Sequence, residues 1–304
     1  MSNISDQTEL PCRVDDGGPA VRHRIQPRDT DLGGFSVRRL LPVAECRSVG
    51  PWVFFDHMGP ADFAAGEGVN VRPHPHIGLA TVSYLFEGEM LHRDSLGNEQ
   101  CIVPGDINLM TAGRGIVHSE REREAFRARP HRTHGLQLWP ALPAEDEECE
   151  PSFDHYPSDA IPKLDVDGVP VRVLIGSAWG AHSPVVTRSP TLYAEAKLAA
   201  GQSLRLPAAA ERAVYAVDGA LSISGCELPA QAMAVVEPGR ELVVSALAPA
   251  RLAIIGGEPL GARHMNWNFV SSRRERITRA REDWAAGRFP TVPGDAEEFI
   301  PLPD

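Results

Sequence analysis

The sequence predicts an all-β protein built as a sandwich or a barrel. Glycine and proline each occur 27 times among 304 residues, which favours many short strands and turns over long helices. Short segments rich in β-branched and aromatic residues recur between these turns, as they do in antiparallel sandwiches and barrels. A chain of this length can form two domains of ordinary size.

The first group of predicted strands begins near Phe35. Its strongest member, residues 80–86, reads ATVSYLF and ends at the turn residues Glu87 and Gly88. A Pro-Gly-Asp turn and a pair of closely spaced glycines separate the strands that follow. These further strands are predicted at residues 101–103, 107–110 and 135–139.

Residues 140–163 differ in composition from the segments on either side. They contain five prolines and the acidic run EDEE at residues 145–148, which predicts a solvated linker. We therefore expect two domains, residues 1–150 and residues 151–304.

The second β-rich block, about 164–258, contains a short internal repeat of the first. The segment YAVDG at 215–219 lies 131 positions after the segment YLFEG at 84–88. The first block contains two candidate metal ligands, His74 and His76. At the same offset, the second block has Arg205 and Pro207 in their place. The repeat predicts a duplicated barrel in which only the first copy binds metal.

The C-terminal part of the chain predicts one amphipathic helix at about 273–286, docked on a barrel. The S-R-R-E pattern at 272–275 is typical of a capping box, and apolar residues recur at helical spacing up to Trp284. Gly287 is expected to end the helix. The remaining residues are irregular and rich in proline.

Composition excludes several classes of function. The formal net charge is -11, from 30 basic and 41 acidic residues, so direct binding to nucleic acid is not expected. No apolar run approaches the ~18 residues of a membrane span, and the N-terminus carries no signal-peptide pattern. The five cysteines form no C-x-x-C pair, which is typical of a reduced cytoplasmic protein.

Two short segments carry the functional prediction, RPHPH at 72–76 and GRGIVHSE at 113–120. Residues two apart on a strand share one face, so each segment presents a pair of possible metal ligands. If both strands line one barrel, three imidazoles and a carboxylate converge. Such a set suits a first-row transition metal with open coordination positions, iron first and zinc still possible. The predicted ligands are His74, His76, His118 and Glu120.

A single H-x-H segment would more often be a pair of surface histidines beside a proline turn. The second motif changes this interpretation, because it follows about 40 residues later, enough chain to return to the same barrel. Gly113 and Gly115 also permit a tight turn with positive φ just before the second pair.

Together the motifs resemble those of the cupin superfamily, and more closely those of the pirin family. The resemblance extends from about residue 35 to the end of the chain. Many cupins have a glutamate shortly after H-x-H, where this chain has Leu79, Ala80 and Thr81, and the pirin pattern has the carboxylate at Glu120 instead. Besides the two histidine segments, the resemblance rests on residues 81–84, 87–88, 104–106, 110–115, 134–139, 267–272, 294–295 and 299–303.

The resemblance implies two jelly-roll (cupin) barrels in tandem with a C-terminal helix. It implies one divalent metal in the N-terminal barrel, iron(II) first, held by His74, His76, His118 and Glu120. The C-terminal barrel is expected to lack metal ligands.

For activity, the resemblance implies first a dioxygenase of the quercetin 2,3-dioxygenase type. Such an enzyme opens the ring of a flavonol with O2 and releases carbon monoxide, and Glu120 would accept the substrate's hydroxyl proton. The segment FFDHMGP at 54–60 resembles the quercetinase-type members. Vertebrate members are transcriptional coregulators, and some bacterial members regulate metabolic enzymes. The alternative is therefore an iron-dependent regulatory or redox-sensing protein that binds a partner protein. A metal-free binding or structural protein is a third hypothesis.

Several other residues are ambiguous from sequence alone. Arg114 either holds its loop or faces the pocket. The expected partners are a flavonol-like small molecule and O2, with a monomer as the expected state. His131 and His134 are likewise ambiguous, whereas structural roles are favoured for His57, His92, Trp139 and Trp179.

Overall fold

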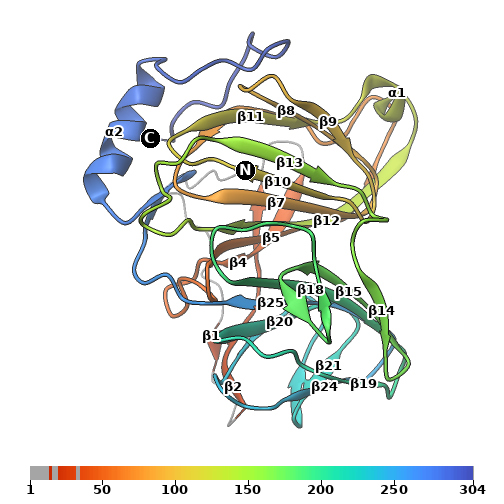
Figure 1. Ribbon diagram of the computed structural model, residues 1–304. Helices are drawn as coiled ribbons and strands as arrows, with labels where there is room; N and C mark the ends of the chain where they lie inside the picture. Colours follow the sequence, from red (N-terminus) through yellow and green to blue (C-terminus); the bar gives the residue numbers. More distant parts are fainter. Residues whose placement is uncertain (1–13, 16–19, 32–34, 304) are drawn as a thin grey trace.

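The computed structural model describes residues 14–15, 20–31 and 35–303 (Figure 1). It confirms the mostly β class and the C-terminal helix. Of the five cysteines, Cys12 lies outside the described residues, and the other four are free. Within the described ranges, neither helix is long and apolar enough to cross a membrane.

The N-terminal half consists of two antiparallel sheets. Figure 1 shows β8, β9 and β11 lying above β7, β10 and β13. The larger sheet has the order β13 (Ser152–Tyr156), β10 (Ile107–Thr111), β7 (Ala80–Glu87), β12 (His131–Pro140), β5 (Trp52–Phe63), β4 (Ser36–Leu41) and β3 (Arg28–Asp31). The smaller sheet has the order β6 (Val71–His76), β11 (Ile116–Arg121), β8 (Met90–Asp94) and β9 (Glu99–Ile102).

The C-terminal half repeats this plan with another pair of sheets. The larger has the order β1 (Val14–Asp15), β2 (Val21–Ile25), β23 (Met233–Val236), β20 (Glu211–Asp218), β25 (Ala250–Gly257), β18 (Thr191–Leu198), β15 (Val169–Ile175) and β14 (Lys163–Val166). The smaller has the order β19 (Ser203–Arg205), β24 (Val243–Ala246), β21 (Leu221–Ile223) and β22 (Cys226–Leu228).

Neither half closes into a hydrogen-bonded barrel among the residues that the structure describes. The two sheets of each half are separate in their pairing, which is the double-sheet form of a jelly roll. The internal repeat agrees with this plan, because an offset of 131 carries β7 onto β20. Both strands are central in their sheets, β7 between β10 and β12 and β20 between β23 and β25.

The remaining elements are two hairpins and two helices. The C-terminal helix packs on the hairpin of residues 264–271 through a buried cluster that includes Trp267, Phe269 and Ile277. The elements are β16 (Ser177–Ala178) with β17 (Ala181–His182), β26 (His264–Asn266) with β27 (Phe269–Ser271), α1 (Glu124–Arg127) and α2 (Arg274–Ala285).

The helix prediction is confirmed, but the predicted capping box is wrong. The N-cap is Arg273 instead of Ser272, and it makes no side-chain cap bond. The hydroxyl and the backbone N–H of Ser272 donate to the buried Glu147 carboxylate at 2.9 and 2.7 Å. Gly287 follows the C-cap at φ +65°, as expected for a helix end.

One of the hydrophobic clusters spans both halves. It contains Trp52, Tyr84, Tyr193 and Tyr215, which come from both of the larger sheets. The indole N–H of Trp52 donates to backbone oxygens of Leu192 and Gly256 at 3.2 and 3.0 Å. These buried side chains and hydrogen bonds fix the two halves against each other.

Strand pairing crosses the predicted division at residue 150 in both directions. Residues of β2 join the C-terminal sheet by pairing with β23, and β13 joins the N-terminal sheet by pairing with β10. The segment predicted as a linker, 140–163, therefore contains a strand. The division at residue 150 stays a prediction.

Candidate metal centre

Three buried histidines from two neighbouring strands form a cluster. His74 and His76 lie on β6, and His118 lies opposite His74 on β11. One ring nitrogen from each lies within 4.8 Å of the others, and the three side chains are at most 1% exposed. The structure thus brings together the three histidines that the two motifs predicted.

The prolines of the first motif fit the place of β6 in its sheet. Proline has no backbone N–H to give to a ladder, so it is confined to edge strands. β6 is an edge strand that pairs only with β11 in the sheet order. Pro73 and Pro75 alternate with the histidines there, which leaves His74 and His76 on one face.

The glycine turn before β11 has the predicted geometry. Gly113 and Gly115 have φ of +49° and +150°. A Cβ on Gly113 would lie 2.1 Å from the backbone oxygen of Cys149, so no other residue fits. The turn brings β11 back beside β6.

Hydrogen bonds orient two of the three imidazoles. Nδ1 of His74 donates to the carbonyl of Arg72 at 2.8 Å, so its Nε2 carries the lone pair. Nδ1 of His118 lies 3.4 Å from Nδ1 of His92, and Nε2 of His92 lies 2.9 Å from Asp94. Asp94, His92 and His118 thus form a chain of polar contacts that ends at the cluster.

The spacing of the ring nitrogens fits one shared ion. Nε2 of His76 and Nε2 of His118 lie 3.1 Å apart. Two nitrogens bound to one ion at about 2.1 Å, with about 90° between the bonds, would lie about 3.0 Å apart. Burial also lowers the pKa of all three imidazoles well below 6.5, which keeps them neutral and able to bind a cation.

Glu120, the fourth predicted ligand, is buried but is not a member of the 4.8 Å cluster. The register between β11 and β6 shifts between His118 and Glu120. Its Oε1 accepts hydrogen bonds from the side chains of Gln137 and Ser83. Its Oε2 is buried and finds no hydrogen-bond partner within the described part of the chain. Burial raises the pKa of this carboxyl above its usual value.

The centre lies between the two sheets of the N-terminal half. Ser83 and Gln137 belong to β7 and β12 of the larger sheet, whereas Glu120 belongs to β11 of the smaller. Trp139 of β12 contacts the ring of His76 edge-on at 4.9 Å. Ser83 and Gln137 were missed as site residues in the sequence, although both lie inside segments that carried the family resemblance.

The other histidines lie in separate polar groups. His57 bonds His134 at 2.7 Å and the hydroxyl of Tyr215 at 2.6 Å, inside the interface between the halves. His131 bonds Glu122 at 3.0 Å. His92 is the exception, because it was expected to be structural and instead contacts His118.

Arg114 and the two tryptophans also have defined places. Arg114 is exposed and pairs with Glu150. Trp139 is fully buried and stacks on Phe54 at 3.8 Å, as expected of a core residue. Trp179 is half-buried, and its indole N–H donates to the backbone of Arg205 at 3.1 Å.

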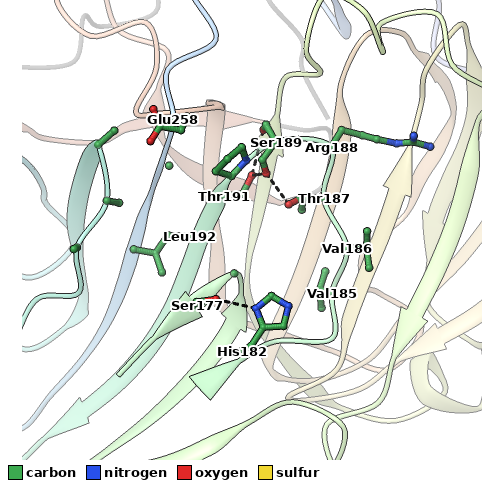
Figure 2. A pocket seen from close by; sticks show the side chains of 16 residues that line it. Ser177, His182, Val185, Val186, Thr187, Arg188, Ser189, Thr191, Leu192 and Glu258 are labelled. Carbon is green, nitrogen blue, oxygen red and sulfur yellow. Dashed lines mark hydrogen bonds between the residues drawn. The ribbon is translucent and has the colours of Figure 1, made fainter. Parts of the chain in front are cut away.

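A cavity of about 630 Å³ in the C-terminal half has no comparable set of donors. Figure 2 shows His182 beside Ser177, with 2.8 Å between Nδ1 and Oγ. The only carboxylate of its lining is Glu258, which lies at the opposite end of the view. This cavity therefore offers neither a metal centre nor a catalytic triad.

Comparison with known proteins identifies relatives along nearly the whole chain. Residues 34–140 match the family model described as Pirin, and residues 193–290 match the model of the Pirin C-terminal cupin domain. A pirin-like protein of Caulobacter vibrioides is 47% identical over 281 residues, which are 91% of this chain and 97% of that protein.

Two further relatives have names that refer to an activity. A Pseudomonas aeruginosa protein with the provisional name quercetin 2,3-dioxygenase is 38% identical, over 100% of this chain and 98% of that protein. The crystal structure of a quercetin 2,3-dioxygenase from Acinetobacter baumannii is 36% identical. It superimposes with a TM-score of 0.86 over 92% of this chain and 94% of that chain.

Proposed function

This chain belongs to the pirin family, and from that premise we propose that it is a metal-dependent dioxygenase. The proposed reaction opens the ring of a flavonol such as quercetin with O2. The quercetinase names of two relatives support the substrate class. The observation that carries the proposal is the buried histidine cluster beside a carboxyl group of raised pKa.

We propose His74, His76 and His118 as ligands of one divalent metal, iron(II) first. The donors are neutral nitrogens without thiolate, which suits iron and also admits other first-row metals. Glu120 is proposed as the fourth ligand. Its unpartnered Oε2 supports this role, because a buried carboxylate oxygen without a donor is costly unless a cation or a proton neutralises it.

A metal bound there would supply a Lewis acid for a flavonol oxyanion and an open position for a further ligand. Glu120 is also proposed to accept the proton of the flavonol 3-hydroxyl at Oε2, once that oxygen is released from the metal. Gln137 and Ser83 hold Oε1, so the other oxygen is the one available to the substrate. A carboxyl whose pKa is raised by burial holds a transferred proton better than an exposed one.

A second candidate function is an iron-dependent regulator or redox sensor that binds a partner protein without turnover. The burial of all three histidines favours it, because a substrate as large as a flavonol must reach donors that are at most 1% exposed. In either case we propose a cytoplasmic protein, since the four described cysteines are free. We also propose that it is a monomer.

The test is an anaerobic titration of the iron-loaded protein with quercetin, followed by exposure to O2. Dioxygenase activity predicts loss of the flavonol absorption band and release of carbon monoxide. Glu120→Gln should keep the metal and lose turnover if Glu120 is the base, and His74→Ala should lose the metal. No carbon monoxide and an unchanged flavonol band in the loaded protein would contradict the enzyme. Retention of a partner protein that depends on iron oxidation state would favour the regulator.

A further inference from the structure

A second cavity, of about 340 Å³, lies between the two halves of the molecule. Tyr84 and Phe86 of β7 line it from the N-terminal half. Pro104 and Gly105, between β9 and β10, line it from the same half, and strands β14, β15, β18 and β25 line it from the C-terminal half. Its volume is within the range of pockets that hold small organic molecules.

Lysine is almost absent from this protein, and both lysines line this cavity. The sequence has 28 arginines but only two lysines, Lys163 and Lys197. They come from different strands, β14 and β18, and meet at the same cavity with Arg172 and Arg251. Four cationic side chains therefore surround one small space in a chain whose formal net charge is -11.

Strand register places like charges opposite each other at this cavity. Lys163 is the direct partner of Arg172 across β14 and β15. Lys197 is the direct partner of Arg251 across β18 and β25. Like charges in directly opposite positions destabilise a sheet. The two like-charge pairs therefore cost stability at this cavity. Local costs of this kind are expected at functional sites.

The one carboxylate of the lining does not neutralise these charges. Glu195 accepts a hydrogen bond from the hydroxyl of Tyr84 and pairs with Arg251 at 3.2 Å. Neither lysine has an ion-pair partner within the described ranges, and both are exposed. With one carboxylate against four cations, the lining has a formal charge of +3.

The two arginines are held in place, whereas the lysines are free to adjust. Arg172 donates to the Tyr84 hydroxyl at 2.9 Å and to the backbone oxygen of Gly105 at 2.8 Å. The guanidinium of Arg251 lies 4.2 Å from the centre of the Phe86 ring. Two fixed guanidinium groups together with two flexible ammonium groups can bind an anion from several sides.

We infer that this cavity binds a small organic anion with two or more negative charges, carried by carboxylate or phosphate groups. The inference does not rest on the proposed dioxygenase function. Arg172 and Arg251 form the fixed part of the site, and Lys163 and Lys197 complete it.

Isothermal titration calorimetry with citrate and with pyrophosphate, at constant ionic strength, tests the inference. One of the two should bind with a saturable 1:1 isotherm, and which one binds distinguishes carboxylate from phosphate chemistry. Lys163→Gln and Lys197→Gln should each weaken binding at least about tenfold, because each removes a hydrogen bond between two charged groups. The matched control is Arg205→Gln, which removes an exposed cation of the same half outside the cavity and should leave affinity unchanged.

Two further measurements keep the outcome interpretable. The thermal midpoint of Lys197→Gln without anion should not fall below that of the parent, because the change removes a like-charge pair. In the parent, a saturating anion should slow acetylation of both lysines by an amine-reactive reagent, read as two mass shifts. Absence of binding by either anion, or equal affinity in the parent and both lysine variants, would overturn the inference.

Discussion

Replacement of His92 by phenylalanine should weaken metal binding without unfolding the protein. His92 is 5% exposed and stacks on Phe153 at 4.2 Å, so a phenyl ring of similar shape can take its place. The change removes the contact at 3.4 Å between His92 and Nδ1 of His118. Asp94 loses one donor but keeps the backbone N–H groups of Leu96 and Asn98, at 2.9 and 3.1 Å.

The expected loss of metal affinity follows from the role of the contact between His92 and His118. A hydrogen-bond partner behind a ligating imidazole fixes its tautomer and its ring orientation, and its removal typically costs 10–100-fold in metal affinity. That range corresponds to about 1.4–2.8 kcal/mol. Deletion of a ligand itself should cost more, so His118→Ala should show no measurable stoichiometric binding under conditions where His92→Phe still saturates.

Competition with a chelator of known affinity would measure the change for iron(II) under anaerobic conditions and for zinc in air. His264→Phe is the matched control, since it makes the same substitution at a half-buried histidine of β26, outside the cluster. A His92→Phe protein that binds both metals as tightly as the parent would refute the proposed chain from Asp94 to His118.

Three other substitutions have definite expected outcomes. Gly113→Ala should lower the free energy of unfolding by about 1–3 kcal/mol or more, because its φ is +49° and its Cβ would meet backbone oxygen at 2.1 Å. Gly180→Ala, where a Cβ meets nothing within 4 Å, should cost less in the same denaturant titration, and equal costs would contradict the steric argument. Burial lowers the pKa of His134 to about 4, so the unfolded state binds its proton first and stability falls as pH drops below about 6.5. Between pH 7 and pH 5, His134→Gln should therefore lose about 2 kcal/mol less than the parent, and parallel pH profiles would count against this. Arg39→Met should destabilise by about 3–5 kcal/mol, since Asp56, 2.8 Å away and fully buried, would lose its charge partner, whereas a neutral result would mean that the pair is not needed.

Local pattern was sufficient to predict the histidine cluster and the duplicated plan. Alternation along β6 and β11 determines which side chains share a face, and the glycine turn determines that β11 returns beside β6. The five-residue repeat located β20 as the counterpart of β7, although the similarity is short. These features depend on neighbours in the sequence or on one short connection.

The missed features depend on long-range contacts. Pairing of β2 with β23 joins residues about 210 positions apart, and nothing in the sequence of β2 specifies that partner. Ser272 has the pattern of a helix cap, but the buried Glu147 competes for its hydroxyl, and tertiary structure decides the outcome. His92 was predicted to be structural. Only the pairing of β8 with β11 brings it near His118, and the sequence does not specify that pairing.

The metal centre and the cationic cavity lie on opposite faces of one strand, which makes their tests independent. Ser83 of β7 faces the metal centre, where its hydroxyl donates to Glu120 at 3.4 Å. Its neighbour Tyr84 faces the other way and bonds Glu195 and Arg172 in the cavity.

Changes at the two sites should therefore add. Lys197→Gln is expected to leave chelator-measured metal affinity unchanged, and His92→Phe to leave anion affinity unchanged. The double variant should show both single losses within about 0.5 kcal/mol, as distant sites without shared partners do. A larger departure from additivity would mean that β7 transmits a change from one face to the other. In that case, by reciprocity, saturation with the anion would change metal affinity by the same factor as metal changes anion affinity.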